Sequence, residues 1–568
     1  MQPSSHEEHG GGRSGPDPAR SPGVLTLPGG PVRVGLGRPS IFHIRRASVK
    51  SAARVHSGFV ILVAVILVVL SHGIQDTTGL SPGDEGYLWY GSLRTAAGDV
   101  PIRDFRSYDP GRYYWCAAFS HLFGDGLLGL RRSSAAFQVV GLLCGLLALT
   151  RAVGSRPFLL LAGICLTLWM QPVYKLFEPA IALIAVWVGV RLLEKPSRTR
   201  LFVSGVFVGL AAFVGRNLGL YAFLAFAALL LYLRFKMRAV PLWRSSAVWV
   251  GGVLAGLSPL WAMMGLIPGF ARSWMESVIF LYARGGANLG VPVPWPWRVV
   301  HSGTALDMLI RVSTGMSFLL VPIFLGVLLI LRVRAPKDRK AAGHLLTACV
   351  FVGLPYAHHA WSRADLTHLA GAIHPILIGL VTVAAASKHR FRWAVPAVLL
   401  IVSTLPGAFY GIPAFHRLSS SAKRYVRADI RGDSMWINHR HARLVNDVAG
   451  VLERNVPSEE SLLIATHSAI LYPLLGRTAP IWDPYLLWPH SEKKQIEMIA
   501  ELERNHTRWV LTSRYTLDGR SDLAPGARNP ILWAYLMREF EPVSLPPLDS
   551  ARTLLVRKGS GEAGAEIE

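Results

Sequence analysis

Charged residues are scarce in this sequence for a chain of its length. Asp, Glu, Lys and Arg make up 17% of its 568 residues, whereas hydrophobic residues make up 51% and the mean hydropathy is +0.35. A soluble protein of this size carries more charge. The apolar residues gather in long uncharged runs, which are typical of helices surrounded by lipid. The composition therefore argues against a single large soluble core.

Cysteine is also rare, with 4 residues in the chain. Cys144, Cys165 and Cys349 fall within apolar runs, and only Cys116 lies clearly outside one. This distribution indicates neither a disulfide framework nor a Cys-rich metal site. The sequence identifies no cofactor with certainty, and no ligand motif supports a divalent metal.

Acidic residues are the less common charge, with 35 against 59 basic residues and a net charge of +24. In a soluble protein this balance would suggest nucleic acid as a partner. The chain has no zinc-finger spacing and, outside the apolar runs, no basic patch interleaved with stacking aromatics. Basic residues accumulate in the cytoplasmic loops of membrane proteins. Membrane lipid, rather than nucleic acid, is therefore the expected partner.

The first apolar run, "SGFVILVAVILVVLSHGI", begins too far from Met1 for an ordinary signal peptide and is interpreted as a retained anchor. Before it, residues 1–54 are rich in Gly, Pro, Ser and Arg, and are predicted to be a disordered cytoplasmic segment. Further apolar stretches predict ten more spans, at about 133–150, 157–172, 173–193, 201–215, 217–233, 246–267, 312–331, 344–360, 366–387 and 393–413.

The loop charges predict the orientation of these spans. With the N-terminus in the cytoplasm, the inner loops hold most of the basic residues, and the short outer loops hold only Lys175, Arg216 and Arg363. An odd number of spans then places the C-terminus outside. The predicted organisation is an integral, multi-pass protein of the inner or plasma membrane, with a membrane domain at 55–413, outer loops at 75–132 and 268–311, and an extracytoplasmic domain at 414–568.

The C-terminal segment has the pattern of a small α/β domain. "HARLVNDVAGVLERN" and "EKKQIEMIAELERNH" are amphipathic and predict helices. "SLLIAT" and "RWVLTS" predict short buried strands, and "TLLVRK" predicts a closing edge strand. This alternation favours a partly parallel sheet, and the segment contains neither a Gly-rich phosphate loop nor a nucleophile elbow.

The first outer loop concentrates acidic residues directly beyond the anchor, in "DEGYLWYGSLRTAAGDVPIRDFRSYDPGRYY". Asp84 and Glu85 are adjacent, so on a helix their side chains diverge by about 100° and are expected to have different roles. A carboxylate near the membrane edge is expected to have a raised pKa, which suits a general base. Asp109 and Tyr113 lie in a turn-rich, aromatic part of the loop that is expected to fold on the membrane surface.

Other polar residues cluster at the outer ends of the predicted spans. Arg216 in "FVGRNLG" is placed to bind a lipid phosphate, and Lys175 with Glu178 is expected to form a local ion pair. The remaining members of this group lie in the loop 268–311 and at a later outer turn, and are Arg284, Arg363, Asp365 and His368. Structural hydrogen bonding is the favoured role for the histidines, because their spacing matches no defined metal site.

The motif after the first span resembles the GT-C glycosyltransferases that use polyprenyl-phosphate sugars, including protein O-mannosyltransferases and bacterial aminoarabinose transferases. The resemblance rests on "DEGYLWYGSLRTAAGDVPIRDF" and "DPGRYYW", and more weakly on "RNLGLY" and "RADLTHL", over roughly residues 55–415. It implies an α-helical polytopic membrane protein and an enzyme that transfers a hexosyl or pentosyl group to a glycan, lipid or protein acceptor.

The resemblance also implies roles for individual residues. Asp84 matches the catalytic carboxylate, Glu85 its positioning partner and Asp104 a second loop carboxylate. Arg216 is the preferred cation for the donor phosphate, on the basis of its charge and location, with Arg284 and Arg363 as further candidates. Asp109, Tyr113, Asp365 and His368 would position the acceptor or the loop.

Two other classes of membrane protein stay open. A flippase or transporter of lipid-linked sugars would also have many spans, but would more often carry polar residues in the middle of its spans. A sugar-binding membrane protein without catalysis would need the C-terminal domain but not the acidic loop.

Overall fold

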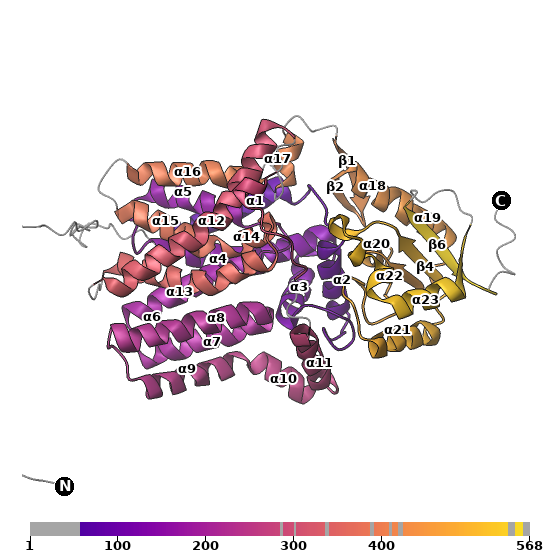
Figure 1. The fold of residues 1–568 in the computed structure, drawn as a ribbon, viewed down its shortest axis with the longest axis horizontal. Helices are drawn as coiled ribbons and strands as arrows, with labels where there is room; N and C mark the ends of the chain where they lie inside the picture. The colour runs from indigo at the N-terminus through magenta and orange to yellow at the C-terminus, as the bar shows by residue number, and fades with distance from the viewer. Residues whose placement is uncertain are drawn as a thin grey trace, which may run out of the picture. The chain divides into compact units, whose positions relative to one another are not determined.

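Apolar helices make up most of the chain before the C-terminal sheet (Figure 1). The computed structural model describes residues 57–283, 288–299, 303–335, 340–386, 391–407, 412–418, 424–543 and 551–559, so the segment 1–54 lies outside it. A helix or a bent pair of helices lies at each predicted apolar stretch: α1 (Ser57–Gln75), α4 (Leu127–Leu149), α5 (Arg156–Trp169), α6 (Phe177–Glu194), α7 (Arg198–Val214), α8 (Arg216–Leu231), α9 (Leu242–Gly256) with α10 (Ser258–Leu266), α12 (Ala305–Arg334), α13 (Ala341–Ser362), α14 (Leu366–Ala372) with α15 (His374–Ala386), and α16 (Phe391–Pro406).

Some of these helices can cross a membrane by length and composition. Within the described residues, 4 are long and apolar enough, namely α1, α4, α12 and the helix that combines α8 with its continuation to Lys236. The number rises to 6 if each bent pair, α9 with α10 and α14 with α15, counts as one span. The polytopic helical fold is thus as predicted, whereas the count of eleven spans stays a prediction.

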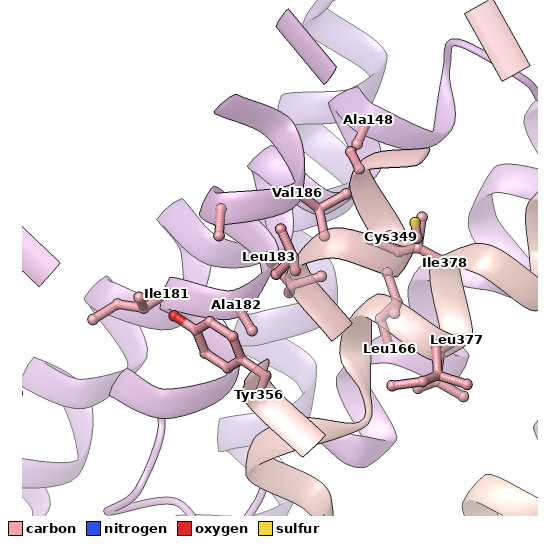
Figure 2. Packing of buried hydrophobic residues seen from close by; sticks show 14 of the residues in the cluster. Ala148, Leu166, Ile181, Ala182, Leu183, Val186, Cys349, Tyr356, Leu377 and Ile378 are labelled. Atoms are coloured by element: carbon pink, nitrogen blue, oxygen red, sulfur yellow. The ribbon is translucent and has the colours of Figure 1, made fainter. Parts of the chain in front are cut away.

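The helical part has its own apolar core. Leu183, Val186, Cys349 and Tyr356 belong to a large buried cluster, and Figure 2 shows members of it from α4, α5, α6, α13 and α15. Small residues allow neighbouring helices to approach closely, since a Cβ added at Gly205 of α7 would meet a backbone oxygen of α9.

The first outer loop folds into two helices, α2 (Asp84–Ala96) and α3 (Pro110–Phe123). Asp84 and Glu85 lie in the first turn of α2, where carboxylates stabilise the positive end of the helix dipole. Asp109 is the N-cap residue of α3 and Pro110 follows it, which is the favoured arrangement at a helix start. The loop is therefore folded, as its turn residues and aromatic residues predicted.

The C-terminal part contains the expected α/β elements and one addition. A 4-stranded sheet has the order β3 (Leu462–Ala465), β4 (Trp509–Ser513), β6 (Arg552–Arg557) and β5 (Phe540–Pro542), and β3 pairs with β4 in parallel. The segment predicted as the closing edge strand is β6, which lies inside the sheet because β5 covers it. A hairpin of β1 (Tyr425–Ile430) and β2 (Asp433–Asn438) was not predicted.

Hydrogen bonds join the C-terminal part directly to the outer loop. The amide of Ile470 donates to the carbonyl of Pro82 at 3.0 Å, and the amide of Arg106 donates to the carbonyl of Trp482 at 2.7 Å. A Cβ added at Gly86 would lie 2.4 Å from the amide nitrogen of Ile470, so this contact between α2 and the C-terminal part requires glycine. The segment around residues 470–490 is consequently held against the outer loop.

The orientation of the chain remains a prediction, which reporter fusions can test. A reporter enzyme fused near residue 440 is expected to report an extracytoplasmic position, because the loop charges place this region outside. A matched fusion after Lys236, in a predicted inner loop, is expected to report the cytoplasm. A cytoplasmic signal from the fusion near residue 440 would contradict the predicted topology.

Candidate active site

A cavity of about 720 Å³ lies between the outer loop, the helical part and the C-terminal part. Its walls come from α2, α3, the segment that precedes α6, and the first turn of α8. They are completed by α11 (Phe270–Ala283), α14, and the start of α21 (Glu492–Arg504). Some of the polar residues that the sequence scatters over several predicted outer segments therefore meet in one place.

Asp84 lines this cavity and forms an ion pair with Lys175. Its Oδ2 accepts a hydrogen bond from Lys175 Nζ at 2.6 Å, and the two side chains are 31% and 25% exposed. Burial raises the pKa of Asp84. The positive charge of Lys175, with smaller contributions from His368 and Arg363, lowers it by more, so the pKa lies below its ordinary value. The expectation of a raised pKa is thus wrong for the free protein, and Asp84 is ionised at neutral pH.

Two further ion pairs join the outer loop to the helical part and line the same cavity. Arg112 Nη1 lies 3.2 Å from Glu178 Oε1, so Glu178 pairs with Arg112 rather than with Lys175 as expected. Arg216 Nε lies 2.5 Å from Asp109 Oδ1, and the Arg216 amide donates to Asp109 Oδ2 at 2.7 Å. Asp109 therefore fixes the start of α8 as well as the guanidinium.

Glu85 faces away from the cavity and is fully buried. Both of its carboxylate oxygens accept hydrogen bonds from Arg131, at 2.7 and 3.0 Å. Arg131 also donates to the carbonyls of Asp76 and Gly79, so it ties the turn between α1 and α2 to α4. The divergence expected for neighbouring carboxylates is observed, with Asp84 at the cavity and Glu85 in the interior.

Two other predicted site residues, Asp104 and Tyr113, do not line the cavity. Asp104 pairs with Arg103 at 2.7 Å and accepts from the Val100 amide, and it is not among the residues that line the cavity. Tyr113 is buried beneath the loop, and its hydroxyl accepts from the amide of Tyr108 at 3.2 Å. Of the predicted residues, the structure brings Asp84, Asp109, Arg216 and His368 together at the cavity.

Arg363 and Asp365 lie beside the cavity rather than in its lining. Arg363 pairs with Asp365 at 2.8 Å and with Asp518 of the C-terminal part at 2.8 Å. Asp365 caps α14 by accepting from the amide and the ring of His368, and these bonds lower its pKa although burial raises it. Arg284 lies outside the described residues.

The C-terminal part supplies one wall of the cavity, with Trp482, Trp488 and the start of α21. Arg106 joins this wall to the outer loop, because its Nη1 donates to Asp483 at 2.8 Å. Asp483 is buried and also lies 2.6 Å from the ring of His490. These contacts make the C-terminal part a structural component of the site.

Lys175 and Arg112 are site residues that the sequence pattern did not predict. Both carried a usable signal, because each is a basic residue in a segment predicted to lie outside, where the positive-inside rule requires none. Spacing predicts a pair between Lys175 and Glu178, and it predicts no partner for Arg112 in "YDPGRYYW". Their true partners are more distant in the sequence, and spacing alone could not identify them.

The described part of the chain contains no group of three or more His, Cys, Asp or Glu side chains that could hold a metal ion. The histidines near the cavity instead form contacts within the protein. His368 bonds to Asp365, and the ring of His359 packs 5.1 Å from that of His368. These histidines are therefore held in place by contacts within the protein.

Comparisons with known proteins give structural matches alone. No protein-family model matches the chain, and no curated protein matches its sequence. Among the matching solved structures is ArnT from Cupriavidus metallidurans bound to undecaprenyl phosphate, with 14% identity, a TM-score of 0.46, and coverage of 89% of this chain and 99% of that one. The apo state of ArnT matches with 12% identity and a TM-score of 0.46, over 88% and 97% of the two chains. Both of these matches are to structures of ArnT.

Proposed function

We propose that the protein is a membrane glycosyltransferase that transfers a sugar from a polyprenyl-phosphate donor to a hydroxyl of an extracytoplasmic acceptor. The observation that carries the proposal is the position of Asp84, an ionised carboxylate that lines a cavity together with the cations Lys175 and Arg216. A carboxylate can accept the proton of a hydroxyl, and a cation can stabilise a phosphate leaving group. The motif that contains Asp84 supports the same assignment.

The reaction that we propose is a single displacement. The acceptor oxygen forms a bond to the anomeric carbon as the bond from that carbon to the phosphate oxygen breaks, which inverts the anomeric centre. The acceptor proton passes to Asp84, and the bond electrons leave with the polyprenyl phosphate. The leaving group is already anionic, so it requires a nearby cation more than a general acid.

The helix α11 supports a donor with a lipid tail. Ile279 lines the cavity and is 59% exposed, and Met275 and Tyr282 on the same helix are 51% and 89% exposed. These positions recur at helical spacing and so present apolar groups on one side of α11. A polyprenyl chain can remain among such groups and the surrounding lipid while its phosphate enters the polar cavity.

Transfer of labelled sugar tests this function against the alternatives of a flippase and a sugar-binding protein. The purified protein in lipid is incubated with radiolabelled polyprenyl-phosphate sugars and a crude acceptor fraction. Label in the acceptor, with release of polyprenyl phosphate, is the expected result. Movement of the labelled lipid across the bilayer without transfer would favour the flippase, and binding without either would favour the sugar-binding protein.

Loss of the Arg216 side chain is expected to weaken donor binding. Arg216→Ala removes a guanidinium from the cavity wall, and a charge-assisted hydrogen bond to phosphate is worth about 1.5–3 kcal/mol. The substitution also leaves Asp109 without its ion-pair partner, so the variant Arg216→Ala with Asp109→Asn serves as a second test. The measurement is the affinity for donor lipid, and unchanged affinity in both variants would make Arg216 a structural residue.

A further inference from the structure

Within the described residues, three ion pairs between the outer loop and the helical part line the cavity, and they differ in how firmly their cations are held. Arg112 is 9% exposed and its partner Glu178 is 11% exposed. Arg216 is bound to Asp109 through its guanidinium and through its amide, and its Nη1 also donates to Ser277 at 2.7 Å. Both arginines are therefore fixed by several contacts.

Lys175 is held less firmly. Its ammonium carries three N–H groups, and in the part of the chain that the structure describes its one side-chain hydrogen bond goes to Asp84. The pair is the most exposed of the three, with 25% of Lys175 and 31% of Asp84 accessible. An anion entering the cavity can therefore reach this ammonium and compete for it with Asp84.

We propose that the donor phosphate takes Lys175 from Asp84, so that Asp84 becomes able to accept the acceptor proton only after the donor has bound. This inference rests on the proposed function and adds an order of events to it. Lys175 acts as a switch between a carboxylate of the protein and a phosphate of the substrate. The order prevents Asp84 from remaining a weak, cation-bound base during transfer.

The surroundings of Asp84 support this exchange. Burial is the largest influence on its pKa and raises it, while the Lys175 ammonium is the main opposing influence. Sharing Lys175 with a phosphate weakens that opposition, so the pKa of Asp84 rises toward the range of a useful base. The other titratable or charged groups around Asp84 remain in place: His368, Arg363, Tyr108, Tyr174 and Tyr485.

The same exchange resets the site. After transfer, the proton is on Asp84 and Lys175 faces the phosphate monoester of the leaving lipid. When the lipid departs, Lys175 returns to Asp84, the pKa of Asp84 falls, and the proton is released to water. No further reactant is needed.

Binding of undecaprenyl phosphate to the full-length protein in phosphatidylcholine nanodiscs tests the exchange without turnover. Asp84→Asn is expected to tighten binding about tenfold, because a neutral amide competes for Lys175 less strongly than a carboxylate does. Lys175→Met is expected to weaken binding by about tenfold or more. In the Lys175→Met background, Asp84→Asn is expected to give no increase in affinity, because the cation that it would release is absent.

The control is Asp99→Asn, which removes a carboxylate from the same outer loop but from an ion pair with Arg94 outside the cavity lining. Its affinity is expected to equal that of the unaltered protein. Unchanged or weaker binding by Asp84→Asn would overturn the exchange, and this arm stands even if Lys175→Met does not fold. Failure of the unaltered protein to bind the lipid would instead count against the proposed function.

A second anionic lipid separates the donor phosphate from lipid phosphates in general. Phosphatidylglycerol is added as a competitor at the same concentration as undecaprenyl phosphate. If phosphatidylglycerol competes weakly, and competes no better in the Asp84→Asn variant, the result supports the assignment of Lys175 to the donor phosphate. An equal gain for both lipids would overturn it, because Lys175 would then respond to any lipid phosphate.

Discussion

Asp84→Asn is expected to slow sugar transfer by about 10²–10⁴-fold, the usual contribution of a general base. Asparagine has nearly the same shape and can hydrogen-bond to Lys175, but it cannot take the proton of the acceptor hydroxyl. Asp84 is partly exposed at the start of α2, so the variant is expected to fold. Binding of the lipid donor is expected to be retained or tightened, so the loss should appear in turnover and not in affinity.

Transfer rate and donor binding should be measured on the same purified preparation. Asp99→Asn is the matched control, because it makes the same chemical change in the same loop and its transfer rate is expected to be unchanged. Near-normal transfer by Asp84→Asn would remove Asp84 from the mechanism. In that case Asp109 would be the next carboxylate to test, because it lines the cavity whereas Asp104 does not.

Arg131→Met is expected to have the largest effect on stability. Arg131 and Glu85 have side-chain exposures of 2% and 0%, so the substitution leaves a carboxylate buried without a counter-ion. Breaking such a pair costs about 3–5 kcal/mol. The change also removes the hydrogen bonds from Arg131 to the carbonyls of Asp76 and Gly79, which hold the turn before α2. We expect a large fall in melting temperature and loss of transfer with it.

Two further variants show whether the buried charge causes this effect. Glu85→Gln in the Arg131→Met background removes the unpaired charge, and is expected to recover part of the stability. Arg538→Met breaks an exposed pair with Glu539 and is expected to change the free energy of unfolding by no more than about 0.5 kcal/mol. A melting temperature of Arg131→Met equal to that of Arg538→Met would contradict a structural role for the Glu85–Arg131 pair.

The contrast between Asp84 and Glu85 shows how far local sequence reasoning reaches. Adjacent residues on a helix point in different directions, so separate roles could be expected before their partners were known. The partners themselves come from distant segments, since Arg131 is on α4 and Lys175 precedes α6. The expected direction of the shift in the pKa of Asp84 was wrong for this reason, because the distant residue Lys175 lowers that pKa.

In the C-terminal part, too, local patterns predict some elements, whereas other features depend on distant segments. The buried strands β3 and β4 were visible as short apolar runs, and the amphipathic α21 was visible from its spacing. The place of β6 inside the sheet depends on β5, a strand of 3 residues with little pattern of its own. That Trp482 and Trp488 line the cavity depends on contacts with the outer loop, which no local pattern encodes.

The sequence by itself determined that the chain is an apolar, helical membrane protein with an acid-rich loop after its first apolar helix and a small α/β region at its end. These properties follow from composition, from hydrophobic periodicity and from the order of residues within single segments. The tertiary structure alone decided that Asp84 faces Lys175, that Arg112 faces Glu178 and that the C-terminal part closes the site. The physical reason is that an ion pair forms between atoms close in space, and the packing of distant helices sets that distance.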